Sequence, residues 1–326
     1  MMKHKCLYCY NDLKGEKDFH EFCSLAFFGT KEPPKLEYSL EQMSELAKNI
    51  VERSVSVPGV QPKLSMSLIN EVKDAGNFRL TVVGALGGNY IFKPPSTDYP
   101  EMPQNEHVTM RIAESFGIRT VPSSLIRLKS GELSYITKRI DRTDDNKKIH
   151  MIDMFQITEA FDKYKSSMEK IGKALDSYSD NTLLDKIFFF ELALFSFLSG
   201  NNDMHLKNFS MIKSTPGWLL APAYDLLNVS ILNPNDKEEL ALTLEGKKSK
   251  LKRGHFESLG QGLGLNDRQI QRVFNRFYKK KDDAMKWVNN SFLSNEMKEK
   301  YKRLLNERYS RIFDEKSTSE KIKLSE

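Results

Sequence analysis

Two carboxylates and an amide near the middle of the sequence could bind magnesium and accept a proton. Asp203 and Asn208 lie in GNNDMHLKNFSMI with four residues between them, and Asp225 lies further on in APAYDLLNVS. This D-x4-N spacing is the one at which a kinase catalytic loop places its base and a Mg2+ ligand, with a second metal-binding aspartate later in the chain. Asp and Asn also form ordinary Asx-turns in loops, so the spacing alone does not identify phosphoryl transfer.

Earlier segments supply, in the order that a two-lobed kinase requires, the groups that would bind ATP. The predicted glycine loop is SVSVPGVQPKL, where backbone N–H groups and Lys63 could cradle phosphates, although Gly59 is its only glycine. Lys93, in the predicted strand NYIFKPP, is expected to bind ATP phosphates, and Glu106 in the following helix is expected to orient it as an ion pair. The alternative is a solvated lysine on an edge strand.

Two further groups of residues are candidates for the nucleotide site. Lys138 and Ile140 lie in ITKRID, where the two halves of the chain join and where adenine would bond to the backbone. Within the predicted catalytic loop, Lys207 could stabilise the transferring phosphoryl group and His205 could hold the loop by hydrogen bonding. The alternatives are an ordinary strand end and a structural histidine.

All three cysteines fall within the first 23 residues. Cys6, Cys9, His20 and Cys23 form the pattern C-x2-C-x10-H-x2-C, a spacing that can place four ligands tetrahedrally around Zn2+. Such a site leaves no open coordination position, so its role would be structural. The alternative is that these cysteines pack as small apolar side chains in the phenylalanine-rich segment FHEFCSLAFFG.

The pattern of apolar and turn residues predicts an α+β protein: a small N-terminal Cys/His module, a β-rich half and a helical half. Short strands punctuated by Gly, Pro and Asn indicate an antiparallel sheet, interrupted by a helix ending at Gly117 and followed by a hairpin turning at Ser130-Gly131. From Met151 onward the pattern is helical, with IFFFELALFSFLSG as its most buried part and NDRQIQRVFNRFYKKKDDAMKWV as an amphipathic helix. We expect boundaries at residues 1–30, 31–140, 141–315 and 316–326, the last being a disordered tail.

Composition excludes several classes of protein. With 39% hydrophobic and 29% charged residues, the chain can build a core. A net charge of +6 is too small to indicate direct nucleic-acid binding. The apolar stretch Ile187–Gly200 is too short to span a bilayer, and the N-terminus lacks the apolar core of a signal peptide, so we expect no membrane partner and a cytoplasmic location.

Taken together, GVQPKL, YIFKPP, NEH, TKRID, NNDMHLKNFS and APAYDLL resemble the HipA-like serine/threonine kinase toxins of bacterial toxin–antitoxin systems. The resemblance runs from about Ser54 to His255 and implies a two-lobed protein-kinase-like fold that uses ATP and Mg2+. It implies that Asp203 is the proton acceptor, that Asn208 and Asp225 hold Mg2+ and that Lys93 binds ATP phosphates. It further implies that the nucleotide site includes Pro58, Gly59, Val60, Gln61, Lys63, Lys138, Arg139, Ile140, His205 and Tyr224.

The chain resembles the short HipT type of this family, because only 53 residues precede Ser54 where longer relatives have an additional N-terminal subdomain. This likeness implies a small antitoxin protein that corresponds to the missing subdomain, and a DNA-binding antitoxin partner. It also implies an aminoacyl-tRNA synthetase as the protein substrate, phosphorylated on serine, and autophosphorylation in the glycine loop, here at Ser56 and Ser54.

Two other interpretations remain open from the sequence alone. A kinase-like fold could phosphorylate a small molecule, as antibiotic and sugar phosphotransferases do. Alternatively, the Cys/His segment and the basic runs KKSKLKR and YKKK could form a nucleic-acid-binding module, although such runs are usually solvated faces.

Overall fold

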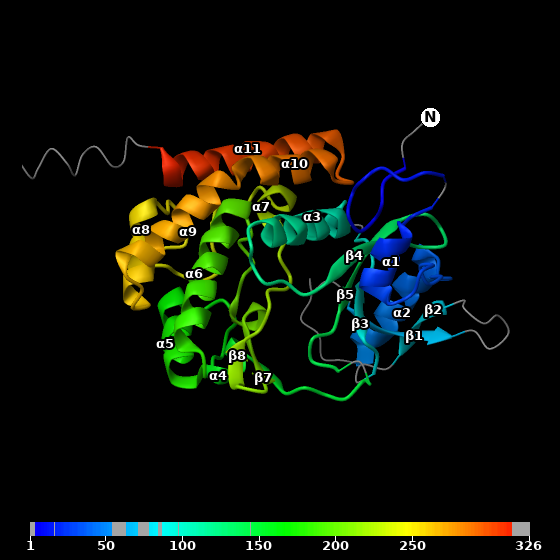
Figure 1. Cartoon of the computed structure of the whole chain (residues 1–326), viewed down its shortest axis with the longest axis horizontal. Coiled ribbons are helices and arrows are strands. Elements are labelled where there is room, and N and C mark those ends of the chain that lie inside the picture. Colours follow the sequence, from blue (N-terminus) through cyan, green and yellow to red (C-terminus); the bar gives the residue numbers. More distant parts are fainter. Residues whose placement is uncertain are drawn as a thin grey trace, which may run out of the picture. The chain divides into compact units, whose positions relative to one another are not determined.

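The computed structural model describes residues 4–15, 17–53, 63–70, 78–83, 87–96, 98–143 and 145–314. The chain divides into two compact units (Figure 1). Unit 1 comprises Met1–Met110, Val121–Ile149 and Asn290–Leu293, and unit 2 comprises Arg111–Thr120, His150–Asn289 and Ser294–Glu326. The predicted tail, residues 316–326, lies outside the described residues.

Unit 1 is built on a five-stranded antiparallel sheet, as the sequence predicts. Its strands are β1 (Leu64–Asn70), β2 (Phe78–Val83), β3 (Tyr90–Lys93), β4 (Ser123–Arg127) and β5 (Leu133–Lys138), in the spatial order β2-β1-β3-β5-β4. β3 is therefore the central strand, and Lys93 pairs with Tyr135 of β5. The predicted hairpin joins β4 to β5, and Gly131 of its turn has a positive φ of 105° that favours glycine.

Three helices accompany this sheet: α1 (Glu21–Phe28), α2 (Leu40–Arg53) and α3 (Met102–Ser115). The first nine residues of α3 belong to unit 1 and its last five to unit 2. After α3, Gly117 has a φ of 81°, its N–H bonds to Glu114 O, and the N–H of Ile118 bonds to Ala113 O. A glycine in the left-handed conformation with two backward bonds is a standard helix end, so the predicted end at Gly117 is confirmed.

Unit 2 is mainly helical and packs around α6 (Thr182–Ser199), which contacts α5, α8 and α11. The phenylalanines of α6 are buried, which agrees with the prediction of a core helix. A small antiparallel sheet has the order β6-β7-β8 (Met151–Asp153, Ser210–Ser214, Gly217–Leu220). The other helices are α4 (Met154–Ile157), α5 (Met168–Tyr178), η1 (Leu206–Asn208, a 3-10 turn), α7 (Val229–Leu232), α8 (Arg253–Gly262), α9 (Asp267–Lys279), α10 (Lys281–Asn290) and α11 (Asn295–Phe313).

The structure differs from the sequence prediction at the segment NDRQIQRVFNRFYKKKDDAMKWV. It forms two helices, α9 and α10, because α9 ends at Lys279 and the N–H of the next residue, Lys280, bonds back to Phe277 O. Both helices are amphipathic and no Gly or Pro marks the break, so the apolar pattern predicts one continuous helix.

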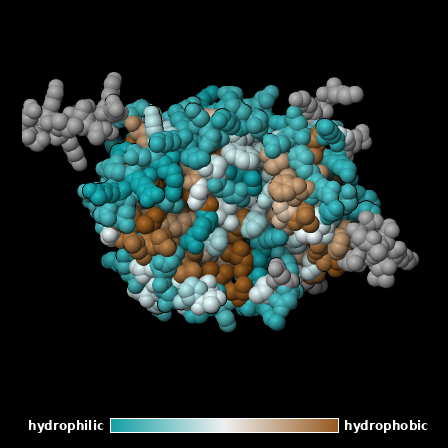
Figure 2. All heavy atoms as spheres, in the orientation of Figure 1, coloured by the Kyte–Doolittle hydropathy of each residue, from teal (hydrophilic) through white to brown (hydrophobic). Residues whose placement is uncertain are grey.

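Within the described ranges, no helix has both the length and the hydrophobicity needed to cross a bilayer. Figure 2 shows one face of the molecule, on which hydrophilic residues predominate and hydrophobic residues gather in a few patches.

Candidate functional site

The predicted ion pair of unit 1 is present and deeply buried. Lys93 Nζ lies 2.6 Å from Glu106 Oε1, and the two side chains are only 5% and 1% exposed. The Lys93 ammonium also lies 5.2 Å from the centre of the Tyr135 ring, a favourable distance for a cation–π contact. These contacts exclude a solvated lysine on an edge strand; the role of Lys93 toward ATP stays a prediction.

In unit 2, the candidate catalytic loop starts where Gly200 ends α6. Gly200 has a φ of 73°, and a Cβ there would lie 2.6 Å from the side-chain oxygen of Asn228. Only glycine fits this turn without moving a neighbour. The N–H and the hydroxyl of Ser230 both donate to the Gly200 carbonyl, at 3.1 Å each. These two bonds hold the start of the loop in place.

The loop brings Asp203 and Asn208 together. Asn208 Nδ2 donates to the backbone carbonyl of Asp203 at 2.9 Å, and the same carbonyl accepts the N–H of His205 at 2.8 Å. Because the amide nitrogen of Asn208 is used in this way, its Oδ1 is the atom that can bind a cation. The loop thus places the Asn208 side chain against the backbone of Asp203, and the roles of the two residues as metal ligand and base stay predictions.

Asp203 has a partner that the sequence analysis missed. The Tyr164 hydroxyl donates to Asp203 Oδ1 at 2.8 Å. Burial and the Asp203 carboxylate both raise the pKa of Tyr164, so the phenol stays protonated and remains a donor. The Asp203 carboxylate can therefore accept a hydrogen bond from a hydroxyl group, and its role as a base stays a prediction.

Asn201 links the two acidic segments and was also missed. Its Oδ1 accepts the N–H of Asp203, and its Nδ2 donates to the backbone carbonyl of Asp225, both at 3.4 Å. Asn201 is fully buried, and Asp225 has a φ of 57°, a left-handed conformation that Asp tolerates better than most residues. Strained backbone of this kind often accompanies functional sites. The sequence offers one sign of a functional role for Asn201, namely the run of polar residues that directly follows the end of α6 at Gly200.

His205, Lys207 and Tyr224 complete this part of unit 2. Burial lowers the pKa of His205 below its ordinary value of 6.5. The negative charges of Asp203 and Asp225 oppose this shift, so both carboxylates interact electrostatically with the His205 imidazole. The Tyr224 hydroxyl donates to the Lys207 carbonyl at 3.0 Å and accepts a bond from Ser210 at 2.5 Å. The Lys207 side chain is exposed, with its ammonium 4.9 Å from the centre of the Phe155 ring.

Lys138 is the last residue of β5, and Arg139 and Ile140 follow it, but the backbone N–H groups of Lys138 and Arg139 already have partners. The N–H groups of Lys138 and Arg139 bond to Pro122 O at 3.0 Å and Asn89 O at 2.8 Å. The Arg139 guanidinium forms a bidentate ion pair with Asp141 at 2.7 and 2.9 Å. Contact of these groups with adenine would require some rearrangement, so the adenine site stays a prediction.

Most of the predicted glycine loop lies outside the described residues. This applies to Pro58, Gly59, Val60 and Gln61, and to the predicted phosphorylation sites Ser54 and Ser56. Lys63 is described and its side chain is exposed.

The structure brings together the predicted zinc ligands. Four ligand atoms lie within 4.8 Å of one another, one from each of Cys6, Cys9, His20 and Cys23. None of the three cysteines forms a disulfide, and Cys6 and Cys23 are buried. A cluster of this composition fits Zn2+.

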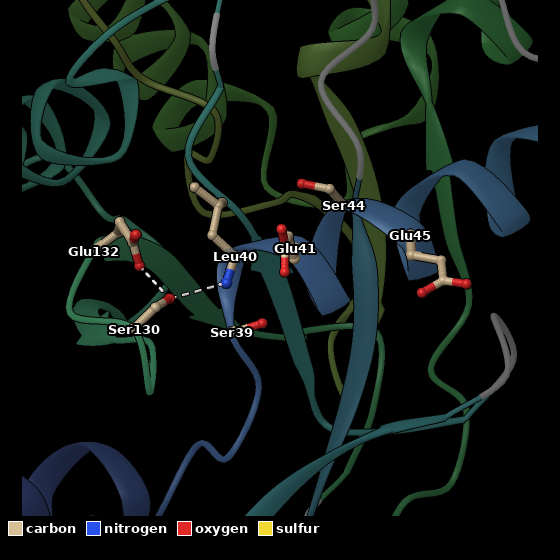
Figure 3. Close-up of a pocket in the computed structure, with 7 residues that line it drawn as sticks. All are labelled: Ser39, Leu40, Glu41, Ser44, Glu45, Ser130 and Glu132. Carbon is tan, nitrogen blue, oxygen red and sulfur yellow. Dashed lines mark hydrogen bonds between the residues drawn. The ribbon is translucent and has the colours of Figure 1, made fainter.

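A surface pocket of unit 1 has none of these residues in its lining (Figure 3). The pocket has a volume of about 570 Å³ and is lined by Ser39, Leu40, Glu41, Ser44, Glu45, Ser130 and Glu132. Three carboxylates would repel phosphate groups, so this pocket is unsuited to ATP. The bonds from Leu40 N–H to Ser130 Oγ at 2.9 Å and from Ser130 to Glu132 tie the start of α2 to the β4–β5 turn.

Comparison with known proteins identifies the family. The model of the HipA-like C-terminal domain matches residues 55–285, which is more than half of the chain. A Haemophilus influenzae protein named "Putative kinase" is 28% identical over 292 residues, which cover 80% of this chain and 82% of that protein. The Shewanella oneidensis protein named serine/threonine-protein kinase toxin HipA is 24% identical over 212 residues, 59% of this chain and 47% of that protein.

Two solved structures share the fold. The first is Shewanella oneidensis HipA in a complex with HipB and operator DNA, with a TM-score of 0.65 and 20% identity over 85% of this chain and 71% of that one. The second is the Helicobacter pylori proinflammatory kinase CtkA, with a TM-score of 0.53 and 20% identity over 73% of this chain and 92% of that one. A β-rich unit and a helical unit of this kind form a kinase-like fold, and the chain belongs to the HipA-like C-terminal domain family.

Proposed function

We propose that this chain is a serine/threonine protein kinase that transfers the γ-phosphate of ATP to a protein hydroxyl. The observation that supports this most is the 2.8 Å bond from the Tyr164 hydroxyl to the Asp203 carboxylate. This bond supports the assignment of Asp203 as the general base, because a base for a serine or threonine must accept a hydrogen bond from its hydroxyl group. The relatives that are named as kinases support the same activity.

In this proposal, Asp203 accepts the proton of the acceptor hydroxyl as that oxygen forms a bond to the γ-phosphorus. The bond between the γ-phosphorus and the β–γ bridging oxygen breaks, and ADP leaves with the electron pair. Lys207 offsets the negative charge on the transferring group; its exposed side chain can move to the phosphate.

Asn208 and Asp225 would hold Mg2+ through an amide and a carboxylate oxygen, the hard ligands that this ion prefers. Bound magnesium neutralises phosphate charge. Asn201, by bonding to Asp203 N–H and to the Asp225 carbonyl, fixes the backbone of the base relative to that of a metal ligand.

Lys93 would bind the ATP phosphates, held in position by Glu106. The loop from Pro58 to Lys63 would cover the phosphates. The remaining contacts to the nucleotide would come from Lys138, Arg139, Ile140, His205 and Tyr224.

The proposed substrate is a serine of an aminoacyl-tRNA synthetase, so that the kinase acts in the cytoplasm as a toxin that stops translation. The proposed partners are a DNA-binding antitoxin and a small antitoxin protein. The Shewanella oneidensis complex, which contains HipA, HipB and operator DNA, supports a DNA-binding partner. The alternative acceptor is a small molecule, which the site geometry in unit 2 does not distinguish from a protein hydroxyl.

We also propose autophosphorylation at Ser56 and Ser54. A phosphate would add nearly two negative charges beside the ATP phosphates, and like-charge repulsion would weaken nucleotide binding. Incubation with Mg-ATP followed by peptide mass spectrometry tests this. Unmodified Ser54 and Ser56 in an otherwise active enzyme would contradict it.

The proposed function is tested by adding radiolabelled ATP and the purified chain to a cell lysate. The native chain and Asp267→Ala, a change at an exposed residue of α9, should label one dominant band of synthetase size, whereas Asp225→Ala should not. Equal labelling by all three chains, or by none, would contradict the proposal. Labelling of a small molecule alone would favour the alternative acceptor.

A further inference from the structure

The Cys/His cluster has distances that fit a tetrahedral metal site. With Zn–S of roughly 2.3 Å and Zn–N of about 2.0–2.1 Å, neighbouring ligand atoms in a tetrahedron lie about 3.5–3.8 Å apart. His20 Nδ1 lies 3.4 Å from Cys9 Sγ and 3.7 Å from Cys23 Sγ. These two distances fit such a site, and since the four ligand atoms lie within 4.8 Å of one another, binding an ion needs movements of roughly 1 Å.

Backbone bonds orient the groups of the cluster toward the same point. His20 Nε2 lies 3.2 Å from the Asp12 carbonyl, which can only accept, so Nε2 is the protonated nitrogen. The lone pair of Nδ1 then faces the two thiols, which is the arrangement typical of a metal-binding histidine. The turn between Cys6 and Cys9 is closed by the bond from Tyr10 N–H to Cys6 O at 2.9 Å, and Tyr10 has a φ of 63°.

Tyr10 connects this turn to α3. It follows Cys9 directly, it is buried, and its hydroxyl lies 2.7 Å from His107 Nδ1. His107 Nε2 lies 3.3 Å from the Ser123 carbonyl, so Nε2 carries the hydrogen and Nδ1 accepts from the Tyr10 hydroxyl. His107 is itself fully buried, and these two hydrogen bonds, one at each ring nitrogen, fix the orientation of its ring.

His107 is the neighbour of Glu106 in α3, and Glu106 forms the buried ion pair with Lys93. A shift of α3 away from β3 would lengthen the 2.6 Å contact between Glu106 and Lys93. The turn that contains two cysteines is thus joined, through one tyrosine and one histidine, to the helix that orients the lysine.

We propose that Cys6, Cys9, His20 and Cys23 hold a structural Zn2+, and that the zinc-bound turn keeps α3 in place through the bond between Tyr10 and His107. In this arrangement Tyr10 is a positioning residue for Lys93. The first part is independent of the proposed function, whereas the second part rests on the binding of ATP by Lys93.

The zinc site is tested by elemental mass spectrometry of the purified full chain and by substitution with Co2+. We expect one zinc per chain, its loss in Cys23→Ser, and the intense absorption of cobalt–thiolate bonds in the cobalt-loaded protein. If Cys23→Ser does not fold, the cobalt spectrum of the native chain decides whether the site binds metal. A well-folded chain without zinc and without a cobalt–thiolate band, or with a disulfide among these cysteines, would overturn the site.

The link to α3 is tested by Tyr10→Phe, with Tyr38→Phe, a half-buried tyrosine of the same unit, as the matched control. Tyr10→Phe should keep its zinc and raise the KM for ATP about three- to tenfold, with a smaller change in kcat, because the variant loses the hydrogen bond from Tyr10 to His107 Nδ1. Removal of zinc from the native chain with a chelator should raise the KM in the same direction. Tyr38→Phe should behave as the native chain.

Two outcomes separate this inference from the proposed function. If the native chain contains zinc but does not bind Mg-ATP at all, the proposed function and the second part of the inference fail while the zinc site stands. If the native chain binds Mg-ATP and Tyr10→Phe binds it equally well, only the link from the zinc site to α3 is overturned.

Discussion

The two units hold their charged functional groups in different ways. In unit 1, Lys93 and Glu106 form a direct ion pair from which water is almost excluded. In unit 2, Asp203 is half-buried, and its carboxylate accepts a hydrogen bond from a neutral hydroxyl, that of Tyr164. A buried charge needs a permanent counter-charge, whereas a partly exposed carboxylate can exchange one hydroxyl for another. The comparison indicates a fixed ion pair in unit 1 and an exchangeable hydrogen bond in unit 2, which the proposed function uses for nucleotide binding and for catalysis.

The largest effect on stability is expected from breaking the fixed pair. Glu106→Gln leaves the Lys93 ammonium buried beside a neutral amide, and removal of one member of a buried pair costs about 3–5 kcal/mol. Denaturant unfolding should show this loss in the free energy of unfolding, together with weaker binding of Mg-ATP.

The double variant Lys93→Met with Glu106→Leu is the matched control. Because well-packed apolar residues can replace a buried ion pair at little cost, it should recover most of the stability but none of the ATP affinity. Recovery of both would show that the pair has no part in nucleotide binding.

A smaller effect is expected from Asn201→Ala, which removes the link between the two acidic segments of unit 2. Loss of its two hydrogen bonds, to Asp203 and to Asp225, should cost about 1–3 kcal/mol. We expect phosphoryl transfer, measured with saturating ATP, to fall as well.

Asn202→Ala separates stability from activity. Asn202 is also buried, and it bonds to Asp236 at 3.0 Å and to the Glu238 carbonyl at 3.1 Å instead. It should lose similar stability but keep its transfer rate. Equal loss of transfer in both variants would mean that the general stability of the loop, rather than the Asn201 link, determines the rate.

The smallest effect is expected from Tyr164→Phe. It frees the Asp203 carboxylate from a competing donor worth about 0.5–1.5 kcal/mol, so transfer to the acceptor should rise about two- to tenfold at low acceptor concentration. Tyr178→Phe, a change at an exposed tyrosine of α5, is the control and should change nothing. A decrease in transfer would show that Tyr164 assists Asp203 instead of competing for it.

The elements that position these groups could be predicted because their signals are local. The apolar run of α6 and its terminal Gly200, and the apolar residues before Lys93, mark buried elements directly in the sequence. The ion pair between Arg139 and Asp141 could also have been predicted, since the two residues are close in the sequence, but it was overlooked.

The contacts of Tyr164 and Asn201 could not be predicted in the same way. Tyr164 lies 39 residues from Asp203, and Asn201 bonds to Asp225 across 24 residues, so no spacing or period marks either contact. They depend on how the segments before and after α6 fold back toward its end. The left-handed backbone of Asp225 is likewise a product of the fold, because no local pattern requires it.

The most direct test of the proposed chemistry is the transfer rate of Asp203→Asn, which keeps the shape of the side chain but removes its ability to accept a proton. Single-turnover transfer from radiolabelled ATP should fall about 10²- to 10⁴-fold, while the variant stays folded and binds Mg-ATP as the native chain does. A folded Asp203→Asn chain that transfers phosphate at the native rate would contradict the assignment of Asp203 as the base.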